Sequence, residues 1–403
     1  MSTAAEPIEA ACLPAGFSFS AVTAGIKASG RPDLALISAE EGANAAAVFT
    51  KNRVVAAPLE VGRAFLAHSR GRVRAVVVNS GNANCATGKA GRVACERVCR
   101  EAAQLLGTLS QQIFPSSTGI IGVPFPADKV LAALPGLCEA RQASESGLRR
   151  FAEAIMTTDK RPKIASAQVR VGKKCFSIAG VAKGSGMIHP QLATMLVYVL
   201  TDLSASPAEL RRSLRNASDQ TFNCISVDGD TSTNDTVLLL ASGASGVQFR
   251  DAAGKFYDAL LTVCQSLAEQ IVADGEGVQH VIRLHIEQAR NRDEALRIAK
   301  AIAHSLLVKT AFAGADPNWG RILAAVGACG INIRPEQIEI AIGSQTVFQR
   351  GTVKAFDQQR AHYELAQPRS DVRVSLRRGR SSLVFLTTDL TSEYVRINAE
   401  YST

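Results

Sequence analysis

The sequence predicts a globular protein of the α/β or α+β class. Three observations favour this class. Short apolar runs typical of strands alternate along the chain with apolar residues spaced as in helices. The 403 residues are 46% hydrophobic and 20% charged, which is typical of a protein with a large core. At roughly 150 residues per domain, this length predicts two or three structural units that need no disulfide.

The first clear elements are a strand and a helix. The strand is Arg74–Asn79, an apolar run that ends in a turn of Gly and Asn residues. The helix follows it, because apolar residues then recur along one predicted helix face: Val93, Val98, Leu105 and Leu106. A strand followed by a helix is the basic unit of an α/β fold.

A second strand, Thr194–Leu200, leads into a helix that begins after Ser206. The sequence Ser206-Pro-Ala-Glu209 is a capping box with proline at the first helical position. Two further helices are predicted at about 254–273 and 293–308, and four strands at 281–287, 338–349, 371–377 and 382–388. Tyr394–Ile397 is also typical of a strand. The glycine-rich Asp274–Gly277 is the predicted change of domain.

Composition excludes several classes of protein. No apolar run approaches the ~20 residues of a membrane helix, and the first 26 residues hold no Lys or Arg, unlike a signal or transit peptide. Nine scattered cysteines, an odd number, indicate buried thiols in a reducing compartment. We therefore expect a cytoplasmic protein. Cys95 and Cys99 share a predicted helix face, but no second pair at ligand spacing follows them, so we expect no zinc site.

The formal charge of +9 has two interpretations. It is typical of some nucleic-acid binders, but the basic residues occur as scattered pairs without aromatic residues between them. We expect an ordinary basic surface that attracts small anionic substrates.

Common catalytic motifs are absent. Gly81–Lys89 fails the spacing of a phosphate-binding loop, and neither Gly-x-Ser-x-Gly nor His-Glu-x-x-His occurs. An acidic cluster contains Asp228, Asp230 and Asp235, but its spacing is not that of a calcium loop. Turn formation and capping of backbone groups are the favoured interpretation of this cluster.

The most informative stretch is Lys183–Asp202. A Gly-rich turn with a lysine leads to an Ala193–Thr194 step, and Thr194 begins an apolar strand. If the peptide bond before Thr194 is cut, the new α-amine has a reference pKa of about 7.7–8.0. That amine then acts as the base for its own hydroxyl, which needs no His or Asp. A β-branched residue that simply begins a strand explains the same pattern.

Seven stretches in matching order resemble the ornithine acetyltransferase/glutamate N-acetyltransferase family of arginine biosynthesis, whose members cut an Ala-Thr-Met-Leu sequence before the Thr. They are Ala24–Lys27, Gly30–Leu36, Asn79–Asn84, Ser117–Gly122, Val227–Thr236, Asp316–Arg321 and Asn398–Thr403. The resemblance covers nearly the whole chain.

The resemblance assigns roles to individual residues. It makes Thr194 the nucleophile, with cleavage between Ala193 and Thr194, and it makes Thr118 and Gly119 the pair that stabilises an oxyanion. It implies that substrate is held by Thr157, Lys183, Thr194, Glu276, Asn398 and Thr403. Lysine suits an α-carboxylate, and Glu276 suits the ammonium group of ornithine.

The resemblance also implies a fold and a division of the chain. The fold is an αββα core of the N-terminal-nucleophile type, related to D-aminopeptidases, with a smaller C-terminal α/β domain. Cleavage gives an α chain of residues 1–193 and a β chain of 194–403. The main domain is expected to contain residues 1–277 and about 388–403, and the smaller domain about 278–387.

The implied reaction moves an acetyl group from N-acetyl-L-ornithine to L-glutamate through acetyl-Thr194, releasing ornithine and forming N-acetylglutamate. No metal or organic cofactor is expected, and acetyl-CoA is left open as a second donor. We expect no nucleic acid or membrane as partner, and αβ pairs that form a heterotetramer of two α and two β chains. An amidohydrolase or aminopeptidase on the same scaffold, or a basic nucleic-acid protein, are the alternatives.

Overall fold

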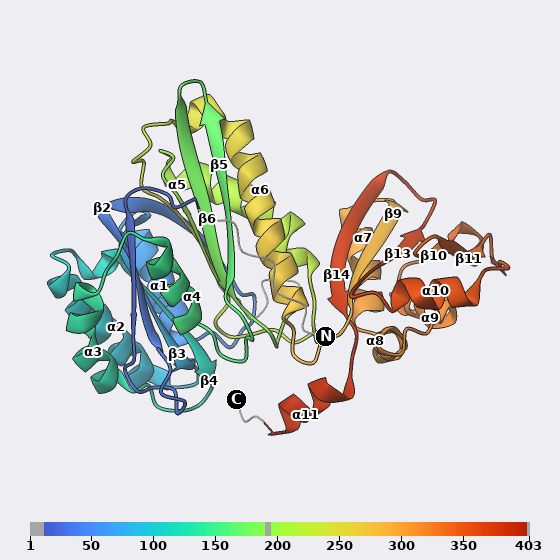
Figure 1. The fold of residues 1–403 in the computed structure, drawn as a ribbon, viewed down its shortest axis with the longest axis horizontal. Coiled ribbons are helices and arrows are strands. Elements are labelled where there is room, and N and C mark those ends of the chain that lie inside the picture. Colours follow the sequence, from blue (N-terminus) through green and yellow to red (C-terminus); the bar gives the residue numbers. More distant parts are fainter. Residues whose placement is uncertain (1–11, 190–194, 401–403) are drawn as a thin grey trace.

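The computed structural model describes residues 12–189 and 195–400, which contain two β-sheets and eleven α-helices (Figure 1). This confirms the predicted mixture of strands and helices. No helix in the described ranges is long and apolar enough to cross a membrane.

The first sheet has eight strands in the order β4-β3-β2-β8-β7-β6-β5, with β1 paired to β2. Its strands are β1 (Phe17–Val22), β2 (Leu34–Phe49), β3 (Arg72–Asn82), β4 (Ile113–Ile120), β5 (Lys163–Val171), β6 (Lys174–Lys183), β7 (Leu196–Thr201) and β8 (Thr236–Ala241). The predicted strand at 74–79 is confirmed as part of β3.

The long strand β2 folds this sheet into two layers. Its residues 34–38 and 43–44 pair with β3, and its residues 44–49 pair with β8. The register shifts between Ser38 and Ala43, and Gly42 there has a φ of +75°. One apolar cluster contains residues of both layers, including Ile37 and Val76 of one and Tyr198 and Leu238 of the other. The two layers therefore pack face to face.

Helices cover both outer faces of this sandwich. The layer of β3 packs on α1 (Ala57–His68), α2 (Gly88–Leu105) and α3 (Ala127–Glu139), whereas the layer of β7 packs on α5 (Pro207–Gln220) and α6 (Phe249–Ala273). Helix α4 (Glu145–Ala154) places Phe151 in the cluster between the layers. The order of layers is thus helix, sheet, sheet, helix, as the resemblance implies.

The second sheet has the order β12-β11-β10-β13-β9-β14. Its strands are β9 (Val281–Ala289), β10 (Glu339–Ile342), β11 (Gln345–Gln349), β12 (Thr352–Val353), β13 (Arg369–Ser375) and β14 (Ser381–Thr388). It packs with α7 (Arg292–Ala303), α8 (Leu306–Ala313), α9 (Trp319–Ala328) and α10 (Gln358–Leu365) around a separate apolar core. We call residues 281–388 the second lobe; it stands to the right in Figure 1.

Helix α11 (Ser392–Glu400) follows β14 and lies apart from the second lobe, at the bottom of Figure 1. The predicted strand at Tyr394–Ile397 is wrong, because these residues belong to this helix. The Thr391 hydroxyl accepts a hydrogen bond from Tyr394 N at 3.3 Å and so helps to begin it.

Other predicted elements differ in their bounds. The capping box of Ser206 and Glu209 is confirmed, as is the helix at 254–273, which lies within α6. The helix predicted at 293–308 is two helices, because Ser305 caps a new one, α8. The strand predicted at 338–349 is a hairpin of β10 and β11, turning at Gly343, which has a φ of +54°.

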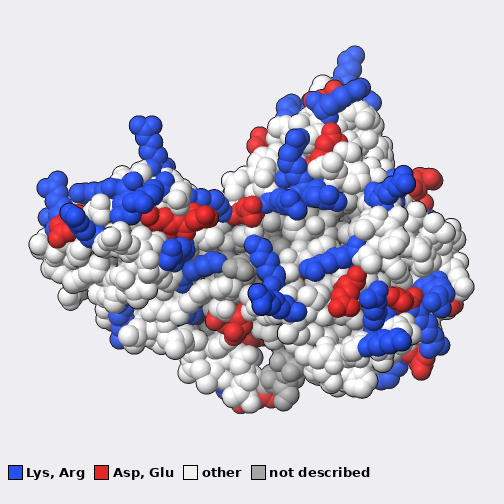
Figure 2. Space-filling view, turned by 180° about the vertical axis from the view of Figure 1, so that it is seen from behind, with Lys and Arg blue, Asp and Glu red and all other residues white. Residues whose placement is uncertain are grey.

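Charged side chains are distributed over the surface. Figure 2 shows one face on which Lys and Arg side chains are interspersed with Asp and Glu. Six of the nine cysteines are buried, in agreement with the expected buried thiols.

Candidate active site

Most of the predicted site residues gather at one edge of the sandwich. Strands β3, β4 and β6 end there, and β7 and β8 begin there. Asn234, just before β8, joins the two layers at this edge: its side-chain amide donates to Ala83 O at 2.7 Å and to Ser117 O at 2.9 Å. The edge is therefore a continuous rim built from both layers.

Thr118 and Gly119 lie at the end of β4. Thr118 is only 5% exposed, and Gly119 has a φ of +132°. A Cβ at Gly119 would lie 2.3 Å from the carbonyl carbon of Gly81, so only glycine fits there. Backbone and hydroxyl donors fixed in this way are suited to stabilising an oxyanion.

Lys183 ends β6 and is 3% exposed. Its Nζ donates a hydrogen bond to the Thr157 hydroxyl at 2.8 Å, and Thr157 N donates to the Asp159 carboxylate at 3.0 Å. Burial lowers the pKa of Lys183, and the nearby Asp159 opposes this shift. The structure thus brings Lys183 and Thr157 into direct contact, as neighbours in one candidate substrate site.

Glu276 follows α6 and lies against the turn after Lys183. Its N–H donates to Ser185 O at 3.1 Å, and a Cβ at Gly186 would lie 2.6 Å from the Glu276 carboxylate. Asn398 of α11 donates its side-chain N–H to Glu276 Oε2 at 2.9 Å. The structure therefore brings Glu276 and Asn398 together beside the turn that carries Lys183.

Ala193, Thr194 and Thr403 lie outside the described residues. The residues on either side of 190–194 are firmly held. Asp228 accepts hydrogen bonds from Met187 N at 2.6 Å and Ile188 N at 2.9 Å, and Asp235 accepts one from Met195 N at 3.0 Å.

These bonds explain the acidic cluster. Asp228 and Asp235 cap backbone N–H groups, as predicted, and burial raises the pKa of both, that of Asp228 to about 6. Within the described ranges, no group of three or more His, Cys, Asp or Glu residues is arranged to hold a metal ion.

Sequence reasoning missed three charged residues beside the site. Lys163 is fully buried, and its ammonium group pairs with Asp159 at 2.7 Å and with Asp274 at 2.6 Å. In the sequence they stand in polar stretches typical of exposed turns, and no local signal marks them as buried. The only hint is the spacing of Asp159 and Lys163, four residues apart.

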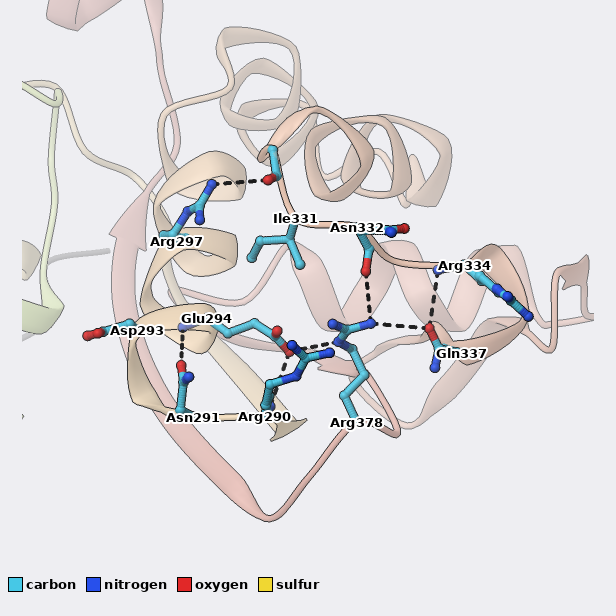
Figure 3. Close-up of a pocket in the computed structure, with 11 residues that line it drawn as sticks. Arg290, Asn291, Asp293, Glu294, Arg297, Ile331, Asn332, Arg334, Gln337 and Arg378 are labelled. Atoms are coloured by element: carbon cyan, nitrogen blue, oxygen red, sulfur yellow. Dashed lines mark hydrogen bonds and ion pairs between the residues drawn. The ribbon is translucent and has the colours of Figure 1, made fainter.

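A large hollow of about 640 Å³ lies in the second lobe and contains none of the predicted site residues. Figure 3 shows that the guanidinium groups of two of its four arginines, Arg297 and Arg378, bind protein groups. Arg297 donates to Cys329 O and Gly330 O, while Arg378 pairs with Glu294 at 3.0 Å and donates to Asn332 O. These arginines join the loops of the lobe, so the hollow is not our candidate site.

Comparisons with known proteins give a consistent answer. The model of the ArgJ family matches residues 18–403. The chain is 44% identical to the arginine biosynthesis bifunctional protein ArgJ of Methylococcus capsulatus, over 97% of this chain and 96% of that protein.

Two solved structures are also similar. One is the protein of the same name from Bacillus halodurans, 39% identical, covering 51% of this chain and 98% of that chain with a TM-score of 0.49. The other is an ornithine acetyltransferase of Mycobacterium tuberculosis in complex with ornithine, 36% identical, covering 45% of this chain and 94% of that one with a TM-score of 0.39.

Proposed function

The chain belongs to the ArgJ family, and from this membership we propose that it is an acetyltransferase of arginine biosynthesis that cuts its own chain before Thr194. The reaction transfers an acetyl group from N-acetyl-L-ornithine to L-glutamate. The observation that carries the proposal is the pairing of Lys183 with Thr157 and of Glu276 with Asn398 around one turn, which offers both signs of charge to an amino-acid substrate.

The proposed nucleophile is the Thr194 hydroxyl. Its oxygen attacks the acetyl carbonyl of N-acetylornithine while the free α-amine of Thr194 accepts the hydroxyl proton. The amine returns this proton to the ornithine nitrogen as the C–N bond breaks, which leaves acetyl-Thr194. The amine of glutamate then attacks the ester, its proton returns to the Thr194 oxygen, and N-acetylglutamate departs. The bonds and protons of these steps balance without a metal or organic cofactor.

Thr118 and Gly119 are proposed to stabilise the oxyanion of both tetrahedral intermediates. One well-placed donor of this kind contributes about 3–4 kcal/mol to such a transition state. The pairing of Gly119 with Gly81 and the close approach of the two backbones support this role, because they fix the position of the turn against β3.

Lys183 is proposed to bind the substrate α-carboxylate, and Glu276 the side-chain ammonium of ornithine. Both side chains are buried, so their charges act through little intervening water. Asn398 supports Glu276 by its hydrogen bond, and Thr403 is proposed to add a hydroxyl at the chain end. We also propose an assembly of two α and two β chains, to be checked by native mass spectrometry.

The test combines intact mass spectrometry with an acetyl-transfer assay. We expect two fragments, the second beginning at Thr194, and transfer of acetyl from N-acetylornithine to glutamate. Thr194→Ala is expected to stay one chain and to transfer nothing, because both hydroxyl and cleavage are lost. An active protein that remains a single 42.6 kDa chain would contradict the proposal.

Two further arms of the assay separate related functions. Acetyl-CoA in place of N-acetylornithine distinguishes an enzyme with two donors from an enzyme with one. Release of acetate at the same rate with and without glutamate would indicate a hydrolase instead.

A further inference from the structure

Lys163 lies at the centre of a buried charge network beside the site, and we propose that it is a positioning residue that keeps Lys183 free to bind the substrate carboxylate. The inference rests on the proposed function. Lys163 does not touch substrate in this proposal; it acts through Asp159.

The network contains two ammonium groups and two carboxylates. Lys163 is 0% exposed and donates to Asp159 Oδ1 at 2.7 Å, to Asp274 Oδ2 at 2.6 Å and to Arg161 O at 3.3 Å. An ammonium group has three N–H donors. All three of its donors are therefore used by protein acceptors.

The two carboxylates extend the network to the segments that carry the site. Asp159 also accepts hydrogen bonds from Thr157 N at 3.0 Å and Gly184 N at 2.7 Å. Asp274, two residues before Glu276, has a backbone carbonyl that accepts from the Ser185 hydroxyl at 2.7 Å. Lys163 thus ties together the segments of Thr157, Lys183 and Glu276.

Lys183 stands at the margin of this network. Its Nζ forms an ion pair with Asp159 Oδ2 at 3.8 Å, which is beyond hydrogen-bond distance, and within the described residues its one hydrogen bond goes to Thr157. Lys163 holds the closer position on Asp159, at 2.7 Å, and the two lysines together compensate the charge of this carboxylate. Two donors of Lys183 then remain for a carboxylate ligand.

Removing Lys163 would leave the buried Asp159 with only Lys183, at 3.8 Å, as a nearby cation and without its direct hydrogen bond to an ammonium group. An uncompensated buried charge is strongly unfavourable, and Lys183 is the nearest cation that can approach. We expect it to move onto Asp159 and away from the substrate. The loss therefore appears in substrate binding rather than in the chemical step.

A purely structural role for Lys163 has to be distinguished from positioning. Lys163→Met alone leaves two buried carboxylates and lowers stability in either case. In the double variant Lys163→Met/Asp274→Asn the network is neutral again, since Asp159 and Lys183 compensate each other, and much of the stability should return. In this variant Lys183 still lies beside an Asp159 that has lost its hydrogen bond to Lys163. The double variant thus separates positioning from stability.

The experiment measures self-cleavage, thermal unfolding, and kcat and KM for N-acetylornithine in the cleaved parent and double variant. We expect KM to rise about tenfold or more in the double variant, while kcat changes less than about threefold. Ornithine binding measured by calorimetry should weaken by a similar factor. A parental KM and a parental ornithine affinity in the folded, cleaved double variant would overturn the inference.

Lys309→Met is the matched control. Lys309 is equally buried, at 3% exposed, and donates to Thr388 O at 2.6 Å and to the Thr388 hydroxyl at 2.9 Å. This variant should lose stability but keep the parental KM. A parent protein that does not transfer acetyl would contradict the proposed function. The role of Lys163 is contradicted only if the parent is active and the double variant has the same KM for N-acetylornithine and the same affinity for ornithine.

Discussion

Glu276 shows how a single carboxylate is prepared for an ammonium ligand. It is buried, it lies against Gly186, and Asn398 donates to one of its oxygens. Glu276→Gln keeps the size of the side chain but removes its charge. We expect this variant to cut itself normally, since cleavage involves no free substrate, and to lose about tenfold or more in kcat/KM for N-acetylornithine.

The control is Glu269→Gln, because Glu269 is an exposed residue of α6 that pairs with Arg369 at 3.6 Å. It should transfer acetyl at the parental rate. Parental kcat/KM in Glu276→Gln would refute the assignment of Glu276.

Two histidines make stability depend on pH. His189 Nδ1 lies 3.2 Å from His304 Nε2, and burial lowers the pKa of each to about 4. The unfolded chain, with histidine pKa values near 6.5, binds more protons than the folded chain between these values. Stability is therefore full above about pH 6.5 and is lost as the pH falls toward 4.

His304→Gln should flatten this dependence. Thermal unfolding measured from pH 7 to pH 4 is expected to show a smaller fall in Tm for this variant than for the parent. The control His68→Gln, an exposed position on α1, should behave like the parent. Equal slopes in His304→Gln and the parent would contradict the prediction.

At the residue scale, the resemblance named candidate substrate-binding residues, but it did not name the residues that support them. Lys183 and Thr157 do meet, as do Glu276 and Asn398. Lys163 was not predictable, because its burial depends on Asp274, which lies 111 positions away in the sequence. A lysine in a polar stretch is far more often exposed.

At the scale of elements, α11 depends on one glycine. Gly277 has a φ of +67°, and a Cβ there would lie 2.3 Å from Tyr394 N. Its carbonyl also accepts a hydrogen bond from the Thr391 hydroxyl at 2.7 Å. Gly277→Ala should therefore push α11 away and break the bond between Asn398 and Glu276.

We expect Gly277→Ala to cost at least about 1 kcal/mol of stability and to raise KM for N-acetylornithine, with self-cleavage retained. Thermal unfolding and kinetics measure both effects. Gly254→Ala is the matched control, because Gly254 lies in α6 with nothing within 4 Å of an added Cβ. It should be neutral or slightly stabilising. A parental KM in Gly277→Ala would show that the position of α11 does not depend on the close approach of Gly277 to Tyr394.

The sequence predicted helices and strands correctly where a distinctive local motif was present, and it failed where the pattern covered only a few residues. The capping box of Ser206 located the start of α5. Tyr394–Ile397 has only four residues, too few to distinguish a strand from a helix turn. In α2 the helix was right but its predicted buried face was right only in part. Val98 and Leu106 are buried, whereas Val93 is 53% exposed, and small residues such as Cys95 and Cys99 also line the core side.

At the scale of the whole molecule, the proposed cut falls between two paired strands. β6 of the first piece pairs with β7 of the second from Ile178↔Thr201 to Lys183↔Leu196, and β2 pairs with β8. Both pairs lie inside the sheet, so cleavage should leave the two pieces bound.

Cleaved protein is therefore expected to elute as one peak in native size-exclusion chromatography, at the volume of uncut Thr194→Ala. The two chains should separate only in denaturant. Separation of the chains under native conditions would contradict this arrangement.

The bend of β2 also imposes an order on protein synthesis. Residues 45–49 of β2 have their strand partners in β8, which the ribosome makes after the cleavage point, so the nascent chain carries an open strand edge until then. A cut that needs the completed rim cannot precede translation of Thr236–Ala241. Nascent chains stalled before Thr236 should remain uncut on electrophoresis, and cutting in such chains would show that the rim is not required. Cleavage then follows complete synthesis of the sandwich, so each first piece is released already paired with its own second piece.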